Sequence, residues 1–299
     1  MVFRKLRFLK VWHFSGNSSN CWKRRNKCMA YFIHEGIRFH YIDLGEGTPF
    51  VFQHGLGGST EQIQNIFIPP AGIRLLSFDF RGHGETNELG PEEKLGFETF
   101  GSDLAAFLDH LNLEKAIVGG ISMGAAVSLN FVLRYPSRTT GSVFSRPAWL
   151  DQPMNPEIRD LFREVARLIC EMEPQIGRYL FATYEPYMEL ARESPAAAQS
   201  FLGYFDYAYA KTTAAKYLAM PADQPCLDRR LWQNIKTPVL VMANGMDPVH
   251  PIEYGKALAD EILQAEFREL TPKTIDSNRH VKDVQRYLET FLKQYEIKQ

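Results

Sequence analysis

Cysteine is scarce in this sequence and its net charge is close to zero, and each shortage excludes a class of protein. The 299 residues include four cysteines, two of them before residue 29, so no disulfide framework is indicated and we expect a reducing, cytoplasmic location. Cys21 and Cys28 do not have zinc-ligand spacing even with His13, and we expect no metal site. The formal net charge of -1 gives no overall basic field for nucleic acid or for a membrane.

Internal repeats, low-complexity segments and convincing membrane spans are also missing. The uncharged run at 116–133 is long enough to raise the question of a span. Its glycines and its change from a strand pattern to a helix pattern place it in a soluble core instead. The remaining composition is that of an ordinary globular protein, long enough to bury a sizeable core.

The first 28 residues differ from the rest, because they contain eight Lys or Arg and no acid. They lack the uninterrupted apolar segment of a secretory signal. An organelle transit peptide or an amphipathic surface anchor stays open. We favour a disordered or dispensable basic extension, residues 1–28, ahead of a natural start at Met29.

The stretch at 116–136 carries the main chemical signal. A short apolar run leads into Gly-Gly-Ile-Ser-Met-Gly, and a helical pattern follows. Glycines two before and two after Ser122 give the G-x-S-x-G spacing of a nucleophile elbow, in which a serine occupies a strained strand-to-helix turn. Ser122 is therefore the candidate nucleophile.

The elements around this stretch alternate between strands and helices. A hairpin is predicted at 31–41, followed by strands at 49–53, 73–79, 116–118, 142–145, 238–243 and 265–270, with helices between most of them. Such alternation predicts an α/β fold with a doubly wound, mostly parallel sheet covered on both faces. Between 151 and 233 the pattern is helical only, which predicts a helical cap (151–233) on a core formed by 29–150 and 234–299.

A serine nucleophile needs a base and a group that orients the base. Asp247 follows a strand in a turn, and His280 precedes the closing helix, so Ser122, Asp247 and His280 occur in the chain order of this architecture. His250 is the competing base, but it lies three residues from Asp247 and we expect it not to span to Ser122. Asp151 is the alternative acid.

The oxyanion of an acyl-transfer reaction needs backbone donors. The N–H of Met123 follows the nucleophile directly, and the glycine-rich loop after the strand at 49–53 offers the N–H of Leu56. His54 and His83 are interpreted as structural residues of their loops.

Taken together, these motifs resemble those of the α/β-hydrolase superfamily. The resemblance covers residue 31 to the C-terminus and is carried by His54-Gly55, by the segment Asp79-Phe80-Arg81-Gly82-His83-Gly84, by the elbow, by Asp247 and by His280. It implies a sheet of eight strands, a cap inserted after the sixth, and no cofactor. Relatives often have a glycine before the histidine, where this chain has Arg279.

Ser122 argues against the dehalogenase-like and epoxide-hydrolase-like branches, which use aspartate at the elbow. Gly-Ile-Ser-Met-Gly resembles carboxylesterases, enol-lactonases and haloperoxidase-like perhydrolases. We therefore expect hydrolysis of a small carboxylic ester, a small-molecule substrate, through an acyl-Ser122 intermediate. Enol-lactone, C–C bond or perhydrolase chemistry with the same residues is the enzymatic alternative, and a non-catalytic ligand-binding protein is the alternative of another class. We expect neither a nucleic-acid nor a membrane partner, and the sequence leaves the oligomeric state open.

Overall fold

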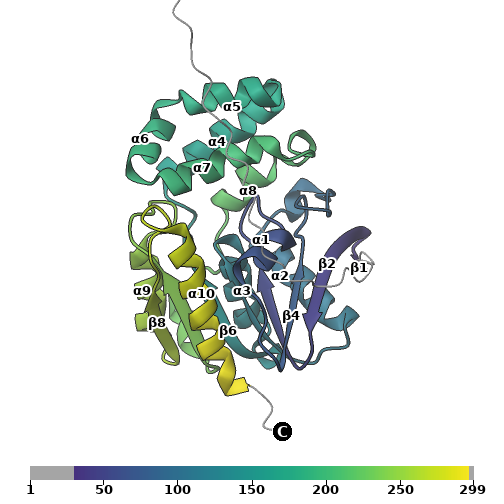
Figure 1. Ribbon diagram of the computed structural model, residues 1–299. Helices are drawn as coiled ribbons and strands as arrows, with labels where there is room; N and C mark the ends of the chain where they lie inside the picture. The colour runs from purple at the N-terminus through teal and green to yellow at the C-terminus, as the bar shows by residue number, and fades with distance from the viewer. Residues whose placement is uncertain (1–29, 296–299) are drawn as a thin grey trace, which may run out of the picture.

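An eight-stranded sheet runs through the centre of the computed structural model, which describes residues 30–295 (Figure 1). The strand order is β1-β2-β4-β3-β5-β6-β7-β8. The strands are β1 (Ala30–His34), β2 (Ile37–Gly45), β3 (Thr48–Gln53), β4 (Ile73–Phe78), β5 (Ala116–Ile121), β6 (Thr139–Ser145), β7 (Val239–Ala243) and β8 (Ala265–Glu269). The predicted extension at 1–28 lies outside the described residues.

The pairing of the strands confirms the predicted α/β class. β2 is antiparallel to both of its neighbours, β1 and β4, and every other pair is parallel. All residues of β5 and β7 are buried, as expected for parallel strands that are covered on both faces. The carboxyl ends of the parallel strands therefore share one edge, and each predicted site segment follows such an end.

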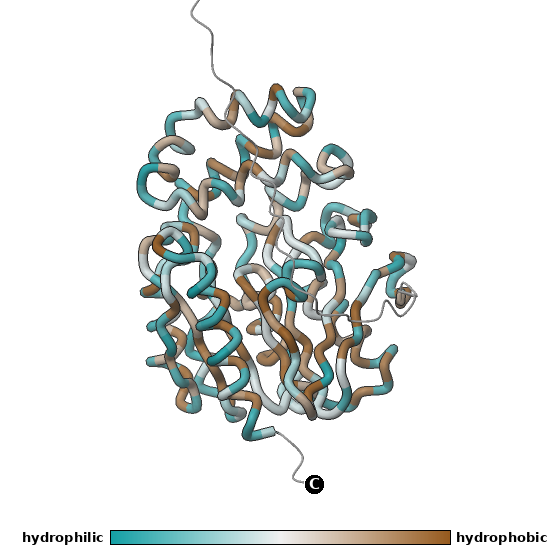
Figure 2. Tube along the Cα trace, in the orientation of Figure 1, coloured by the Kyte–Doolittle hydropathy of each residue, from teal (hydrophilic) through white to brown (hydrophobic). Residues whose placement is uncertain are grey.

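Helices cover both faces of the sheet (Figure 1). The buried clusters place α2 (Phe97–His110), α3 (Met123–Arg134) and α9 (Ile252–Glu261) on one face. They place α1 (Thr60–Ile66) and α10 (Ser277–Leu292) on the other. Figure 2 shows the apolar strands between these helices, whose outer surfaces are more hydrophilic. Among residues 30–295, no helix combines the length and the apolar composition that crossing a bilayer requires.

The helical segment after β6 lies over the carboxyl edge of the sheet (Figure 1). It contains α4 (Pro156–Glu171), α5 (Pro174–Ala182), α6 (Glu185–Glu193), α7 (Pro195–Gly203) and α8 (Lys216–Ala222). Its aromatic side chains pack mainly on one another, with ring centroids 4.8 Å apart for Phe162 and Phe201 and 4.9 Å apart for Tyr204 and Tyr217. We refer to α4–α8 as the inserted helices. The boundaries 151–233 for a separate cap domain stay a prediction.

The largest departure from the predicted elements is at the start of α10. A loop was expected to reach Arg279 and end at His280, but the helix already begins at Ser277. The Asp276 side chain accepts a hydrogen bond from the backbone N–H of Arg279 and so caps the helix. His280 therefore lies in the first turn of α10 and not in a loop.

Strand β5 and helix α3 approach each other closely at the elbow. A Cβ atom on Gly120 would lie 2.5 Å from the backbone carbon of Gly124 and 2.7 Å from the carbonyl oxygen of Gln53. Gly124 likewise has no space for a side chain against the Gln53 carbonyl. The glycines of the motif are thus required by the backbone packing of three elements.

We predict that Gly120→Ala lowers the free energy of unfolding by about 1–3 kcal/mol, because backbone atoms must move to admit the methyl group. Urea denaturation measures this value. The matched control is Gly203→Ala, since Gly203 ends α7 with a φ of -65° and no atom lies within 4 Å of the place its methyl group would take. That control should be neutral or stabilising by up to about 1 kcal/mol; equal losses in both variants would contradict the explanation.

Candidate active site

Ser122 lies between the end of β5 and the start of α3 in a strained conformation. Its φ of 56° and ψ of -113° fall outside the regions that residues with a side chain favour. The turn is held in place because the Ser122 N–H donates to the carbonyl of Ser145 at the end of β6, at 2.9 Å. This geometry exposes the hydroxyl at the carboxyl edge of the sheet, as the motif predicts.

The histidine that lies against this hydroxyl is His250. Its Nε2 is 2.9 Å from Ser122 Oγ, and its Nδ1 is 3.0 Å from Asp247 Oδ2. The expectation that His250 could not span these two groups was wrong. Asp247 and His250 belong to one tight turn, closed by a 3.1 Å hydrogen bond from the His250 N–H to the Asp247 carbonyl, and this turn directs both side chains toward the elbow. The carboxylate that contacts His250 is that of Asp247, and not that of the alternative acid, Asp151.

His280 does not take the position beside Ser122 that the sequence led us to expect. The ring is fully buried, its Nδ1 lies 2.9 Å from the Thr271 carbonyl oxygen, and its Nε2 has no hydrogen-bond partner within residues 30–295. The early start of α10 is the physical reason, since it places the ring in the helix and directs Nδ1 to the preceding loop. The structure thus brings together Ser122, Asp247 and His250 and leaves His280 out of this hydrogen-bonded chain.

Sequence reasoning missed two cationic residues of the site, Arg146 and Lys273. Arg146 directly follows β6, and its Nη2 lies 2.6 Å from Asp247 Oδ2 and 3.0 Å from His250 Nδ1. Lys273 follows β8 and lines the same cavity as Ser122. The sequence signal that could have indicated these two residues is their position. Each is a basic residue just beyond the carboxyl end of a strand in the parallel part of the sheet.

The tautomer of His250 decides what this chain can do. Nδ1 can donate to Asp247 when it carries the proton, and it can accept from Arg146 when it does not, because an arginine only donates. With the proton on Nδ1, Nε2 is free to accept the hydroxyl proton of Ser122. The carboxylate of Asp247 therefore favours the tautomer that can act as a base toward the serine.

The charges of these residues shift one another's pKa values. Burial opposes the ionisation of Asp247, but the neighbouring His250 and Arg146 outweigh it and hold the pKa of this carboxyl well below its usual range. Burial, together with Arg146 and Lys273, lowers the pKa of His250 despite the opposing effect of Asp247. The same causes lower the pKa of His280 to about 4. Both imidazoles are therefore neutral near pH 7.

Strained backbone is concentrated at this site. Ser122, Arg146 and Met246 all have a positive φ (56°, 48° and 56°), a region that residues with a side chain rarely adopt. Each one directly follows β5 or β6 or directly precedes Asp247. Such strain persists where the surrounding structure fixes it, and it is typical of functional sites.

A cavity of about 70 Å³ lies over Ser122, beneath the inserted helices. Its lining is mixed: apolar side chains such as Trp149, Phe162 and Phe201 lie beside polar ones such as Gln62 and Ser200. Leu56 of the glycine-rich loop lines the same cavity, and Met123 is the first residue of α3, where backbone N–H groups point out of the helix. The predicted oxyanion donors thus belong to segments that meet at Ser122, and their role stays a prediction.

His54 and His83 hold the loops around the site, which agrees with their structural interpretation. His54 Nδ1 lies 2.8 Å from the Gly55 carbonyl oxygen, and its Nε2 accepts from the Phe80 N–H at 3.1 Å. His83 Nδ1 lies 2.8 Å from the Arg81 carbonyl oxygen. Burial lowers the pKa of both rings, so both are neutral.

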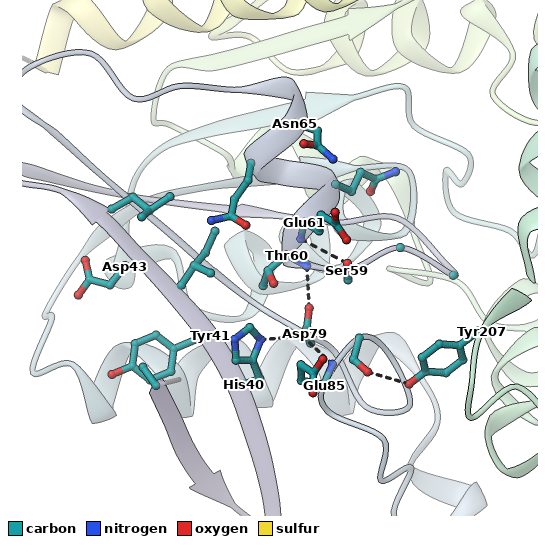
Figure 3. Close-up of a pocket in the computed structure, with 18 of the residues that line it drawn as sticks. His40, Tyr41, Asp43, Ser59, Thr60, Glu61, Asn65, Asp79, Glu85 and Tyr207 are labelled. Carbon is teal, nitrogen blue, oxygen red and sulfur yellow. Dashed lines mark hydrogen bonds and ion pairs between the residues drawn. The ribbon is translucent and has the colours of Figure 1, made fainter. Parts of the chain in front are cut away.

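A separate open groove of about 1070 Å³ lies between β2, the start of α1 and residues 207–209 (Figure 3). Asp79 lies at the base of this groove, and its carboxylate has several hydrogen-bond partners. Its carboxylate accepts from the Thr60 N–H at 2.6 Å and the Glu85 N–H at 2.9 Å, and it lies 2.8 Å from His40 Nδ1. Asp79 therefore joins β2, α1 and the loop after β4, and so supports the glycine-rich loop from behind.

Residues 30–295 contain no group of three or more His, Cys, Asp or Glu side chains arranged to hold a metal ion.

Comparison with known proteins agrees with this fold. Residues 48–168 match the family model described as alpha/beta hydrolase fold. A thermophilic esterase from Thermogutta terrifontis shares the fold with a TM-score of 0.67 at 22% identity, covering 90% of this chain and 98% of that one. The chain has the α/β-hydrolase fold.

Two curated relatives add detail. The AB hydrolase superfamily protein YisY of Bacillus subtilis is 25% identical over 80% of this chain and 90% of its own length. The 2-hydroxy-6-oxononadienedioate/2-hydroxy-6-oxononatrienedioate hydrolase of Comamonas testosteroni is 34% identical, but the match spans 38% of this chain and 41% of that enzyme. The family match and these relatives support an enzyme of the hydrolase class.

We predict that Asp79→Asn lowers the free energy of unfolding by about 1–3 kcal/mol, because an amide nitrogen cannot accept and one buried donor loses its partner. Urea denaturation again gives the value. Asp260→Asn, on the exposed side of α9, is the matched control and should change it by less than about 0.5 kcal/mol. If the two variants were equally stable, Asp79 would not hold these segments together.

Proposed function

We propose that this α/β-hydrolase cleaves a small carboxylic ester through an acyl-Ser122 intermediate, with His250 as the base and Asp247 as the group that orients it. The single observation that carries the proposal is the continuous chain from Ser122 Oγ through both ring nitrogens of His250 to Asp247 Oδ2. His280, the base suggested by chain order, is replaced in this proposal.

In the first half of the reaction, His250 Nε2 takes the hydroxyl proton while Ser122 Oγ attacks the ester carbonyl. The oxyanion is placed near the N–H groups of Met123 and Leu56. The imidazolium then gives its proton to the leaving alcohol as the C–O bond breaks. Water repeats the sequence on the acyl-enzyme, with His250 taking its proton, and releases the carboxylic acid and the free serine.

The small volume over Ser122 supports a short acyl group. Enol-lactone, C–C bond or perhydrolase chemistry with the same three residues remains the enzymatic alternative. A ligand-binding protein without catalysis is the alternative of another class. A fluorophosphonate probe separates the classes, because an activated serine is labelled and an inert one is not. A cytoplasmic location likewise stays a prediction.

We predict that Ser122→Ala and His250→Gln each lower kcat/KM for p-nitrophenyl acetate by about 10³-fold or more, because each removes a member of the proton-transfer chain. His280→Gln should stay within about threefold of the wild type, since this ring forms no hydrogen bond with Ser122. Circular dichroism checks that every variant is folded. A folded His280→Gln that is as inactive as Ser122→Ala, beside an active His250→Gln, would restore His280 as the base.

The lowered pKa of His250 predicts the pH dependence. The neutral ring is the active form, so activity falls as the pH drops through the pKa of His250, and that pKa lies below the ordinary value of 6.5. We expect the acid limb of kcat/KM to have its midpoint below pH 6.5, measured on p-nitrophenyl acetate with the uncatalysed rate subtracted. A midpoint above that value would contradict the electrostatic account.

A further inference from the structure

Lys273 is a basic residue in the lining of the cavity over Ser122, and its side chain forms no hydrogen bond or ion pair within the described residues. The residue follows β8 and lines the cavity over Ser122 together with Arg146 and His250. Its Nζ has no hydrogen-bond or ion-pair partner among residues 30–295, whereas Arg146 is bonded to Asp247. The proposed reaction assigns no step to this ammonium group.

The surroundings of Lys273 have an excess of basic groups. Arg146 comes first among the causes that lower the pKa of Lys273 to about 7, followed by burial, and Asp247 opposes them. Asp247 is also the carboxylate among the main charges that shift the pKa values of His250 and His280. This carboxylate is already bonded to Arg146 and lies against His250, so it does not neutralise Lys273 as well.

A second carboxylate at this place would complete the charge balance, and none of the residues 30–295 forms an ion pair with Lys273. An anionic group on the substrate would lie in a small cavity whose walls include Phe162 and Phe201, where a charge-assisted hydrogen bond to an ammonium group is strong. The negative charge of this substrate group would also favour the protonated form of Lys273.

We propose that the substrate carries a carboxylate on its acyl group, as in a half-ester of a short dicarboxylic acid, and that Lys273 binds this carboxylate while Ser122 attacks the ester carbonyl. The inference rests on the proposed ester hydrolysis and names its substrate class. Lys273 is a binding residue here and takes part in no proton transfer. The cavity of about 70 Å³ limits the acyl chain to a few carbons.

The test compares two esters of the same shape. Monoethyl succinate bears the carboxylate, and ethyl 4-methylpentanoate has an isopropyl group in its place. The readout is the ratio of their kcat/KM values, measured at pH 6.5 by ethanol release. Protonation of His250 affects both esters alike, so it cancels in this ratio.

In the wild type the ratio should exceed its value in Lys273→Gln by at least about tenfold, which corresponds to about 1.4 kcal/mol. Lys273→Arg keeps the charge and should retain most of the preference. Lys256→Gln, a lysine on the exposed side of α9, should leave the ratio unchanged. In the wild type the ratio should also fall as the pH rises through about 7, because the ammonium group loses its proton there, whereas in Lys273→Gln it should stay level.

An equal loss on both esters in Lys273→Gln would overturn the proposal, because it would assign Lys273 to the chemistry or to the fold. An unchanged ratio would overturn it too. Failure of the proposed function gives a different result, since Ser122→Ala would then hydrolyse both esters as fast as the wild type.

Discussion

The close approach of β5, β3 and α3 at the elbow is the constraint on which the site depends. Backbone atoms of these elements leave no space for a side chain at Gly120 or Gly124, so the strand and the helix meet at a fixed separation. Ser122 is held between them at a φ of 56°, which residues with a side chain rarely adopt. Because the turn is rigid, the hydroxyl has one position, and every partner must be supplied at that position by other segments.

Asp247 is the second organising group, since its carboxylate serves a base and a cation at once. Arg146 and His250 both lie against Oδ2, and the buried oxygen Oδ1 has no partner within the described part of the chain. The arginine favours the ionised carboxyl, and the ionised carboxyl favours the tautomer of His250 with the proton on Nδ1. The strained backbone at Arg146 and Met246 places these charges within reach of one another.

The fold and the strand-to-helix turn at Ser122 could be predicted from the sequence because they follow from local patterns. Alternating strand and helix periodicity gave the parallel sheet, and the glycines around Ser122 gave the elbow. Asp247 could be selected because it follows a strand whose end lies near that of β5.

The histidine could not be selected in the same way, because its position depends on two local details of hydrogen bonding. The capping of α10 by Asp276 moves His280 into a helix, and a turn of four residues directs His250 toward the serine. Chain order indicates which segments meet at the sheet edge, but it does not say which of two nearby rings points at the hydroxyl. Arg146 and Lys273 could not be predicted, because no sequence motif marks a basic residue that follows a strand.

The two ends of the inserted helices are attached to the core unequally. At one end the buried ammonium of Lys216, at the start of α8, donates to the Gly82 carbonyl, and the Tyr207 hydroxyl donates to the Gly84 carbonyl at 3.0 Å. At the other end the hydroxyls of Ser194 and Thr274 are 3.4 Å apart, near the upper limit of a hydrogen bond. Lifting α8 would break both of these hydrogen bonds, whereas separating Ser194 from Thr274 would break one long contact. The inserted helices are therefore attached to the core more firmly at α8 than between α6 and α7.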